Sequence, residues 1–284
     1  MRPSREVSVG LIQTLMSRPP RMLDMLEIAL RDLDISIETA SQQYGFRLML
    51  INLRDVRSYE ELDRQIHAVL KNEIGEVVKY LPQVYLNYVK AFFELGELEL
   101  RCLGSSKAAG PASYALSLLT GKDVEEKSAV ITHFEHGTCR NGIEGLLIEY
   151  LNKVRNSFNE IGEDCTWVYE VIKSLAVLHY FRYLRNAELL GLVSPKLDQF
   201  LRLLNLSPLT EIPLKRAVES LERVDKAGLI KYTVYEAVEA LNIANRLLSH
   251  RDGLINLLTL YLVTKYYESK ILRYVFLPKM LKRW

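Results

Sequence analysis

The residues with the clearest metal-ligand spacing lie in the stretch THFEHGTC. His133 and His136 are three residues apart, and Cys139 follows at the same interval. Imidazole and thiolate groups are ligands that zinc prefers, and this spacing can place them on one side of a helix end. A fourth ligand would have to come from Asp164 or Cys165. Two interpretations stay open, a zinc site and a helix end with incidental histidines, and we favour the second because a glycine interrupts the stretch.

Carboxylate pairs are the second candidates for chemistry. All-α enzymes of the isoprenoid-synthase type need aspartates at D-D-x-x-D spacing to hold magnesium against a diphosphate, and this spacing does not occur here. The acidic pairs, Asp32 with Asp34 and Glu125 with Glu126, lack a third carboxylate one turn away. We interpret them as surface charge.

Other catalytic patterns are also missing from the sequence. It has no glycine-rich phosphate loop, no H-E-x-x-H and no G-x-S-x-G. His67, His179 and His250 have no nucleophile at helical spacing, so we interpret them as packed or capping residues. We therefore predict a chain without catalytic residues, cofactor, metal or small-molecule substrate. The alternative is an all-helical enzyme whose groups converge from distant helices.

Composition predicts a globular protein of a reducing compartment. Of the 284 residues, 49% are hydrophobic, which is enough for a sizeable core. A formal net charge of +2 excludes the strongly basic balance of a protein whose main partner is a nucleic acid. Three cysteines without C-x-x-C spacing predict neither a disulfide framework nor a zinc knuckle. The basic end, from Ser269 to Trp284, is either a solvated tail or a contact for an acidic partner or anionic lipid.

The least polar stretch, Gly253 to Thr264, is free of charge for twelve residues. A helix that spans a bilayer needs about twenty such residues. We therefore expect no membrane span, so that any membrane association would be peripheral or through a partner. The first residues, MRPSREVSVGLIQTLMSRPPR, lack the features of a signal peptide, and we expect the chain not to be exported.

Apolar residues recur at helical spacing along nearly the whole chain and predict an all-α fold. Ser58 with Glu61, and Thr233 with Glu236, match the capping box that begins a helix. The run from Arg47 to Leu53 has a strand-like pattern but no partner nearby, so we interpret it as helix or loop.

Glycines and prolines divide the helical pattern into about ten to thirteen segments. The breaks fall at Pro19–Pro20, Gly45, Gly104–Pro111, Gly121, Gly137–Gly142, Pro195, Pro208–Pro213 and Asp252–Gly253. They are too short to separate independent domains, and we expect one continuous body.

The stretch YLVTKYYESKILRYVF, which begins at Tyr261, combines large aromatic residues with charged ones and has two echoes upstream. They are YVKAFFELGELELRCLG and SLAVLHYFRYLRNAELLGL. Each of the three contains a Leu-Arg pair in a long apolar pattern that predicts a helix, with the arginines at Arg101, Arg185 and Arg273. Their separations, 84 and 88 residues, are similar. We therefore predict three similar helical units, approximately 1–110, 111–193 and 194–284.

The third of these helices resembles the C-subunit family of the archaeal and bacterial A-type/V-type ATP synthases, whose eukaryotic counterpart is the d subunit of the V-ATPase. The family pattern there is Y-L-x-x-K-x-x-E-x-x-x-L-R followed by an aliphatic residue. The matching residues are Tyr261, Leu262, Lys265, Glu268, Leu272, Arg273 and Val275. FELGELELRCLG is similar to the family's F-E-L-x-N-L-K-x-x-L-R-G, with Glu97 in place of the asparagine, whereas the middle unit matches only in Leu184 and Arg185. The chain is shorter than is usual for the family.

The resemblance implies a funnel-shaped body with pseudo-threefold symmetry that has no active site of its own. Such a protein connects the central stalk of a rotary complex to the membrane rotor ring, so that rotation is coupled to proton or sodium transport. The implied partners are the D and F subunits of the central stalk and the proteolipid ring. The implied location is the cytoplasmic face of the plasma membrane, where the protein is peripheral.

The charged residues of the three echoing helices have two interpretations. Arg101, Arg185 and Arg273 either orient helices within each unit, which we favour, or form a ring that faces an acidic stalk tip. Lys265 and Glu268 are expected to pair on one helix face, which contributes at most about 0.5 kcal/mol if the pair is exposed. A helical scaffold of the solenoid kind is a further alternative, although solenoid repeats are shorter, about 20 to 50 residues.

Overall fold

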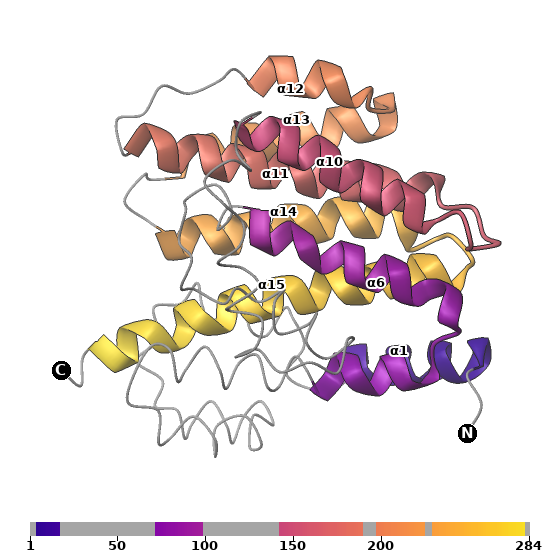
Figure 1. Ribbon diagram of the computed structural model, residues 1–284. Coiled ribbons are helices and arrows are strands. Elements are labelled where there is room, and N and C mark those ends of the chain that lie inside the picture. Colours follow the sequence, from indigo (N-terminus) through magenta and orange to yellow (C-terminus); the bar gives the residue numbers. More distant parts are fainter. Residues whose placement is uncertain (1–3, 18–71, 99–141, 190–196, 225–228, 282–284) are drawn as a thin grey trace, which may run out of the picture.

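The computed structural model describes residues 4–17, 72–98, 142–189, 197–224 and 229–281 (Figure 1). Within these ranges every regular element is a helix and no strand occurs, which confirms the all-α prediction. The run at Arg47, the capping box at Ser58 and the histidine motif at His133 lie outside the described residues.

A helical stretch at residues 72–80 precedes the short helices near Tyr85. The labelled helices in chain order are α1 (Arg5–Ser17), η1 (Gln83–Tyr85), α6 (Leu86–Phe93), η2 (Glu94–Glu97), α10 (Gly142–Ser157), α11 (Thr166–Leu189), α12 (Leu197–Leu204), α13 (Pro208–Glu222), α14 (Leu229–Leu248) and α15 (Leu254–Leu281). The second and third echoing segments thus lie on the long helices α11 and α15, as expected. The first does not form one long helix in its described part, where α6 is followed by the 3-10 helix η2.

The positions of prolines correct one of the expected breaks. Pro208 is the first residue of α13 and Pro213 lies inside that helix, so the break predicted between them is wrong. Proline is tolerated at the start of a helix because its missing N–H would have no intrahelical partner there. Pro278 likewise lies within α15. The break at Asp252–Gly253 is confirmed, since α15 begins directly after it.

The capping box predicted at Thr233 is wrong. Helix α14 begins at Leu229, so both Thr233 and Glu236 lie inside it, and both are buried. Their side chains are used instead for contacts between helices, which are described below.

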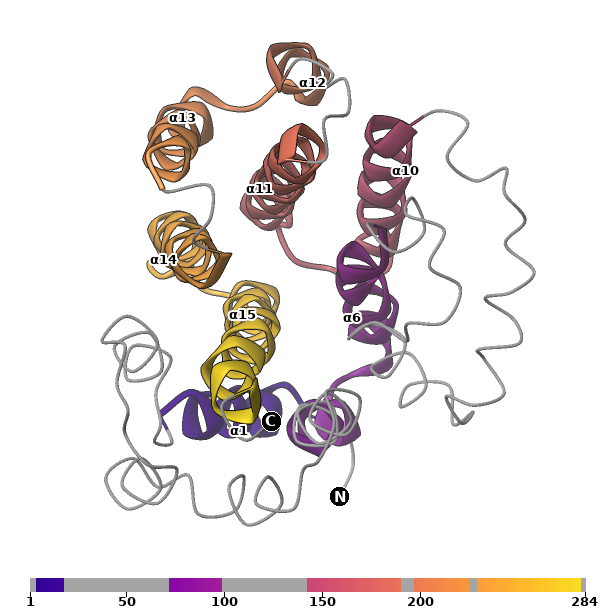
Figure 2. The same cartoon turned by 90° about the vertical axis from the view of Figure 1, so that its left-hand side faces the viewer.

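Viewed end-on, α10, α11, α14 and α15 follow one another along an arc (Figure 2). Helix α14 packs against both α11 and α15, while α10 packs against α6 and α11. Helices α12 and α13 lie beyond α11, and α1 lies at the other end of the molecule, against α15 (Figures 1 and 2). The N-terminal helix is therefore seated on the C-terminal one.

The core contains an unusual number of tyrosines among its largest fully buried side chains, including Tyr88, Tyr180, Tyr232 and Tyr261. A buried hydroxyl needs a hydrogen-bond partner, because burying it without one costs free energy. Tyr88 and Thr259 share such a bond, at 2.8 Å, which joins α6 to α15. This polar contact inside an apolar core fixes how α6 and α15 are aligned.

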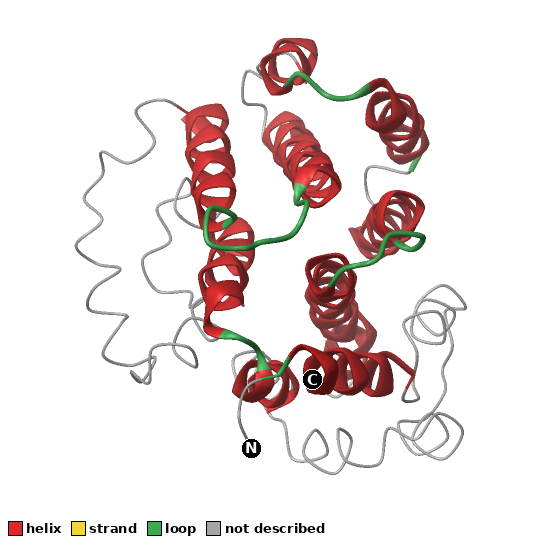
Figure 3. Cartoon of the chain, turned by 90° about the vertical axis from the view of Figure 1, so that its right-hand side faces the viewer, coloured by secondary structure: helices red, strands yellow, loops and turns green. Residues whose placement is uncertain are grey.

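The loop between α10 and α11 and the loop between α14 and α15 lie at the end of the helices that faces the viewer in Figure 3. Glu163 belongs to the first of these loops and contacts residues of three other segments. Its carboxylate accepts a hydrogen bond from the Tyr85 hydroxyl and lies 3.3 Å from the Arg5 guanidinium. It also accepts a bond from the backbone N–H of Ile255 at 3.2 Å. That N–H is in the first turn of α15, where a carboxylate is favoured by the helix dipole. Glu163 thus ties the loop before α11 to α1, to η1 and to the start of α15.

Gly253 leaves the space that Glu163 occupies, and we expect Gly253→Ala to destabilise the protein. Its φ of 135° is strained for residues with a Cβ, and a Cβ there would lie 2.5 Å from Glu163 Oε2. The expected loss is about 1–3 kcal/mol in the free energy of unfolding, measured by urea denaturation. Gly75→Ala is the matched control, because a Cβ at Gly75 meets nothing within 4 Å and alanine favours a helix. Equal losses in the two variants would contradict this account.

Candidate functional site

The structure describes three of the six candidate site residues, which are Arg101, Arg185, Lys265, Glu268, Leu272 and Arg273. Arg185, Lys265 and Glu268 lie in the described part of α11 and α15. Arg101 lies outside the described residues. Leu272 and Arg273 belong to α15, but their side chains lie outside the described part.

Lys265 forms an ion-pair cluster between α15 and residues 72–80. Its Nζ lies 2.7 Å from Glu268 Oε2 and 2.6 Å from Glu73 Oε2. The side chain of Lys265 is only 7% exposed and that of Glu268 14%, whereas Glu73 is 36% exposed. The predicted pair therefore forms, but it is buried rather than at the surface. We call these three residues the Lys265 cluster.

One ammonium and two carboxylates in a buried site shift each other's protonation. Burial by itself lowers the pKa of Lys265, but the charges of Glu268 and Glu73 outweigh burial and raise it. Burial raises the pKa of Glu268, an effect that Lys265 offsets only in part. Lys265 therefore stays charged, and Glu268 is the carboxylate that takes up a proton more readily than usual.

A second cluster, centred on Glu236, joins α11, α14 and α15. Glu236 is 1% exposed, and its Oε2 accepts a hydrogen bond from Arg182 Nε at 2.6 Å. Its Oε1 accepts a bond from the Tyr267 hydroxyl at 3.1 Å and lies 3.7 Å from Lys270 Nζ. Arg182 also donates to Thr233 Oγ1 at 3.3 Å. We call these five residues the Glu236 cluster; it contains both residues of the capping box that was predicted at this position.

Arg185 lies beside the Glu236 cluster and is itself buried. Its guanidinium carbon stands 4.1 Å from the centre of the Tyr232 ring on α14, a distance at which a cation is attracted to an aromatic face. That the three arginines orient helices stays a prediction, because Arg185 is the only one of them whose side chain is described. The alternative, a ring made with Arg101 and Arg273, stays a prediction because those side chains are outside the described part.

The structure brings Lys265 and Glu268 together but places Arg185 with a different set of partners. Both clusters include residues of α15, so this helix is bound to residues 72–80 through one cluster and to α11 and α14 through the other. The arrangement holds helices in register by paired charges inside the protein.

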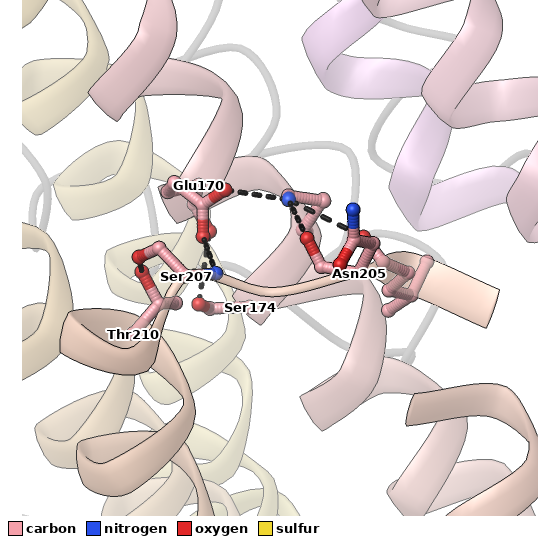
Figure 4. Close-up of polar contacts among 7 residues, drawn as sticks. Glu170, Ser174, Asn205, Ser207 and Thr210 are labelled. Carbon is pink, nitrogen blue, oxygen red and sulfur yellow. Dashed lines mark hydrogen bonds and ion pairs between the residues drawn. The ribbon is translucent and has the colours of Figure 1, made fainter. Parts of the chain in front are cut away.

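A third ionic cluster, which was not predicted from the sequence, holds the turn between α12 and α13 (Figure 4). Lys173 and Glu170, one turn apart on α11, are 2.5 Å from each other. Lys173 donates to the backbone carbonyl oxygen of Asn205 at 3.2 Å, and Glu170 accepts from the backbone N–H of Ser207 at 3.2 Å. The cation therefore binds at the end of α12 and the carboxylate at the start of α13, where the helix dipoles favour those charges. Asn205, with a φ of 44°, makes the sharp reversal between the two helices.

The Glu170 carboxylate gives a pH-dependent expectation. Burial alone raises its pKa, but Lys173, Thr210 and the Ser207 N–H outweigh burial and hold the pKa below its ordinary value. The unfolded state therefore takes up a proton first as the pH falls, and the stability that the charged Glu170 contributes is lost. We expect Glu170→Gln to lose about 1–3 kcal/mol at pH 7. This difference should narrow below about pH 4.3, the ordinary glutamate pKa.

Urea denaturation of both proteins from pH 7 down to about pH 3.5 measures this difference. Glu222→Gln, at an exposed position on α13, is the matched control and should show little change at any pH. If the loss of stability in Glu170→Gln stays constant over this pH range, the carboxylate contributes through its shape rather than its charge.

A signal for these clusters was present in the sequence. Glu170, Lys173 and Arg182 interrupt the otherwise apolar helix α11, in which neighbouring residues on every side are buried. A charge in a helix that is apolar all round must find a partner within the protein. That reasoning identifies the charged residues but not their partners, which come from other helices.

The two residues considered as a fourth zinc ligand directly precede α11. Asp164 Oδ1 accepts a hydrogen bond from the Thr166 N–H at 2.9 Å, and the bonds from Thr166 lower the pKa of Asp164. Cys165 is half-buried, and burial raises the pKa of its thiol to about 11. A raised pKa disfavours the thiolate that binds zinc.

Two further observations concern the described residues alone. They contain no group of three or more His, Cys, Asp or Glu side chains placed to hold a metal ion. Among their helices, none has the length and apolar character that crossing a membrane requires. Comparison of the chain with protein-family models, curated proteins and solved structures found no match.

Proposed function

We propose that this chain is a non-catalytic connector of a rotary A/V-type ATP synthase. It would couple the central stalk to the membrane rotor ring, so that ATP synthesis or hydrolysis is linked to proton or sodium transport. Its partners would be the D and F subunits of the stalk and the proteolipid ring, at the cytoplasmic face of the plasma membrane. In this proposal the approximate units 1–110, 111–193 and 194–284 form a funnel with pseudo-threefold symmetry.

The observation that supports this proposal most directly is the way α15 is built into the molecule. Lys265 and Glu268, two positions of the Y-L-x-x-K-x-x-E-x-x-x-L-R pattern, pair with each other, and Lys265 also pairs with Glu73. Further along the same helix, Tyr267 and Lys270 reach the Glu236 cluster. A helix that is bound to several neighbours by paired buried charges resists sliding and bending, because each displacement would break a charged contact in a low-dielectric interior. Stiffness of this kind is what a torque-transmitting connector requires.

Co-purification from native membranes tests the proposal. The chain, carrying an affinity tag, is expressed in its source cells, and the membranes are solubilised in mild detergent. We expect the D and F subunits of the stalk and the proteolipid to elute with the tagged chain, as identified by mass spectrometry. A tagged unrelated helical protein from the same cells controls for non-specific capture.

Elution of the chain without these proteins would contradict the proposal. The purified chain should also be assayed with prenyl diphosphates and magnesium. Turnover in that assay would instead favour the isoprenoid-type enzyme considered above.

A further inference from the structure

The corner between α12 and α13, residues 202–216, presents aliphatic side chains to solvent. Four large hydrophobic side chains are exposed in the described part of the chain, and three of them lie in this corner: Leu203 (62% exposed), Leu209 (57%) and Ile212 (56%). The fourth, Tyr235, is on α14. Single exposed hydrophobic residues are ordinary, but their concentration in one short segment indicates an interaction surface.

Contacts with α11 hold the corner in place. Its inner side is bound to α11 by Glu170 and Lys173, as described above (Figure 4). Leu209 and Ile212 are three residues apart on α13 and therefore share a helix face. Helix α12 lies at the end of the molecule opposite α1 (Figures 1 and 2). The aliphatic residues are thus carried on a fixed, outward-facing support rather than on a loose loop.

The charges of the corner are mainly positive. Its charged residues are Arg202, Glu211, Lys215 and Arg216. Lys215 pairs with Glu211 at 2.7 Å, and the exposed carboxylate of Asp198, four residues before Arg202 on α12, also acts on Lys215. Arg202 and Arg216 are both exposed, and Arg216 follows Ile212 by four residues on the same face of α13. Arginines therefore stand on both sides of the aliphatic residues in the sequence.

We propose that this corner binds the surface of an anionic lipid bilayer. The side chains of Leu203, Leu209 and Ile212 enter the boundary between headgroups and acyl chains, while Arg202 and Arg216 contact lipid phosphates. Aliphatic residues flanked by arginines suit such an interface, because the apolar groups gain burial and the cations are attracted by the negative surface potential. A protein partner is less well matched, since leucine is under-represented among the residues that dominate protein interfaces. The inference does not rest on the proposed function.

Vesicle co-sedimentation of the full chain tests this inference. We expect binding to vesicles in which about a third of the phosphatidylcholine is replaced by phosphatidylglycerol, and little binding to phosphatidylcholine alone. Replacing Leu203, Leu209 and Ile212 together with glutamine should weaken binding by about a hundredfold, from the lost apolar burial. Arg202→Gln with Arg216→Gln should weaken it by about fivefold per arginine.

Tyr235→Gln and Arg246→Gln are the matched controls, because they replace one exposed aromatic residue and one exposed arginine on α14. Both controls should bind as the unchanged chain does, and circular dichroism checks that every variant is folded. The inference is overturned by a lack of binding, by equal binding to both vesicle types, or by binding that the leucine and isoleucine replacements leave unchanged. It is also overturned if sedimentation velocity shows self-association through the same residues. The vesicles contain neither ring nor stalk, so the result is independent of the co-purification experiment.

Discussion

Lys265→Met is expected to lower the free energy of unfolding by about 3–5 kcal/mol at pH 7. The replacement is close in size but removes the cation that Glu73 and Glu268 both contact. Two carboxylates then face each other at a largely buried site, and at least one must take up a proton for the fold to persist. Because protonation relieves the penalty, the loss should be smaller near pH 5 than at pH 7. Urea denaturation at the two pH values measures both effects.

The variant Glu268→Gln provides the internal control. In the unchanged protein, burial raises the pKa of Glu268, so stability is lost as the pH rises through that raised value. Glu268→Gln alone should therefore lower the free energy of unfolding little, because Lys265 still pairs with Glu73. Combined with Lys265→Met, it should restore a substantial part of the stability that Lys265→Met loses. Lys79→Met, which breaks an exposed pair with Glu76, should change stability little. No recovery in the double variant would mean that Lys265 acts by packing alone.

Glu236→Gln is expected to be as damaging, with a loss of about 3–5 kcal/mol. Glu236 is 1% exposed and faces Arg182 and Lys270. Replacing its carboxylate with a neutral amide takes away the negative charge that these two cations contact. Since the contacts come from α11 and α15, the variant should loosen the packing of three helices at once. Thermal and urea denaturation measure the loss, and near-ultraviolet circular dichroism reports on the buried tyrosines around the site.

Glu239→Gln, three residues further along α14 and less buried, is the matched control and should leave stability nearly unchanged. The double variant Glu236→Gln with Arg182→Met should lose less stability than the sum of the losses in the two single variants. Each single variant removes one member of a buried charged pair, and the second replacement removes the charge that is left behind. Strictly additive losses would show that Glu236 and Arg182 are not energetically coupled.

Local patterns in the sequence predicted the helices because helical hydrogen bonds and side-chain periodicity both act over three or four residues. The pairing of Lys265 with Glu268 was predicted for the same reason. The burial of this pair was not, because it depends on Glu73, far upstream in the chain, whose position is set by how whole helices pack. Short-range spacing therefore identified two of the three residues of the Lys265 cluster and underestimated how much the cluster contributes to stability.

The error at Thr233 and Glu236 has a related cause. A Ser or Thr followed by Glu three residues later satisfies backbone N–H groups only where a helix begins. Inside a helix the same spacing places both side chains on one face. In this protein both side chains accept hydrogen bonds from Arg182 of α11. Nothing within α14 distinguishes these two uses. Glu163 is a similar case, since no local pattern marks a loop carboxylate as the residue that three other segments will contact.

The seating of the N-terminal helix on the C-terminal one has a consequence for how the chain folds during synthesis. Helix α15 contacts α1, α6, α11 and α14, yet it leaves the ribosome after all of them. At typical translation speeds α1 waits on the order of ten seconds or more for its partner. Until then the apolar stripe of α1 and the ring of Tyr88 on α6 have no α15 to cover them. Nascent chains that stop short of α15 should therefore be clients of chaperones, and the packing of these helices should be completed only after α15 has emerged.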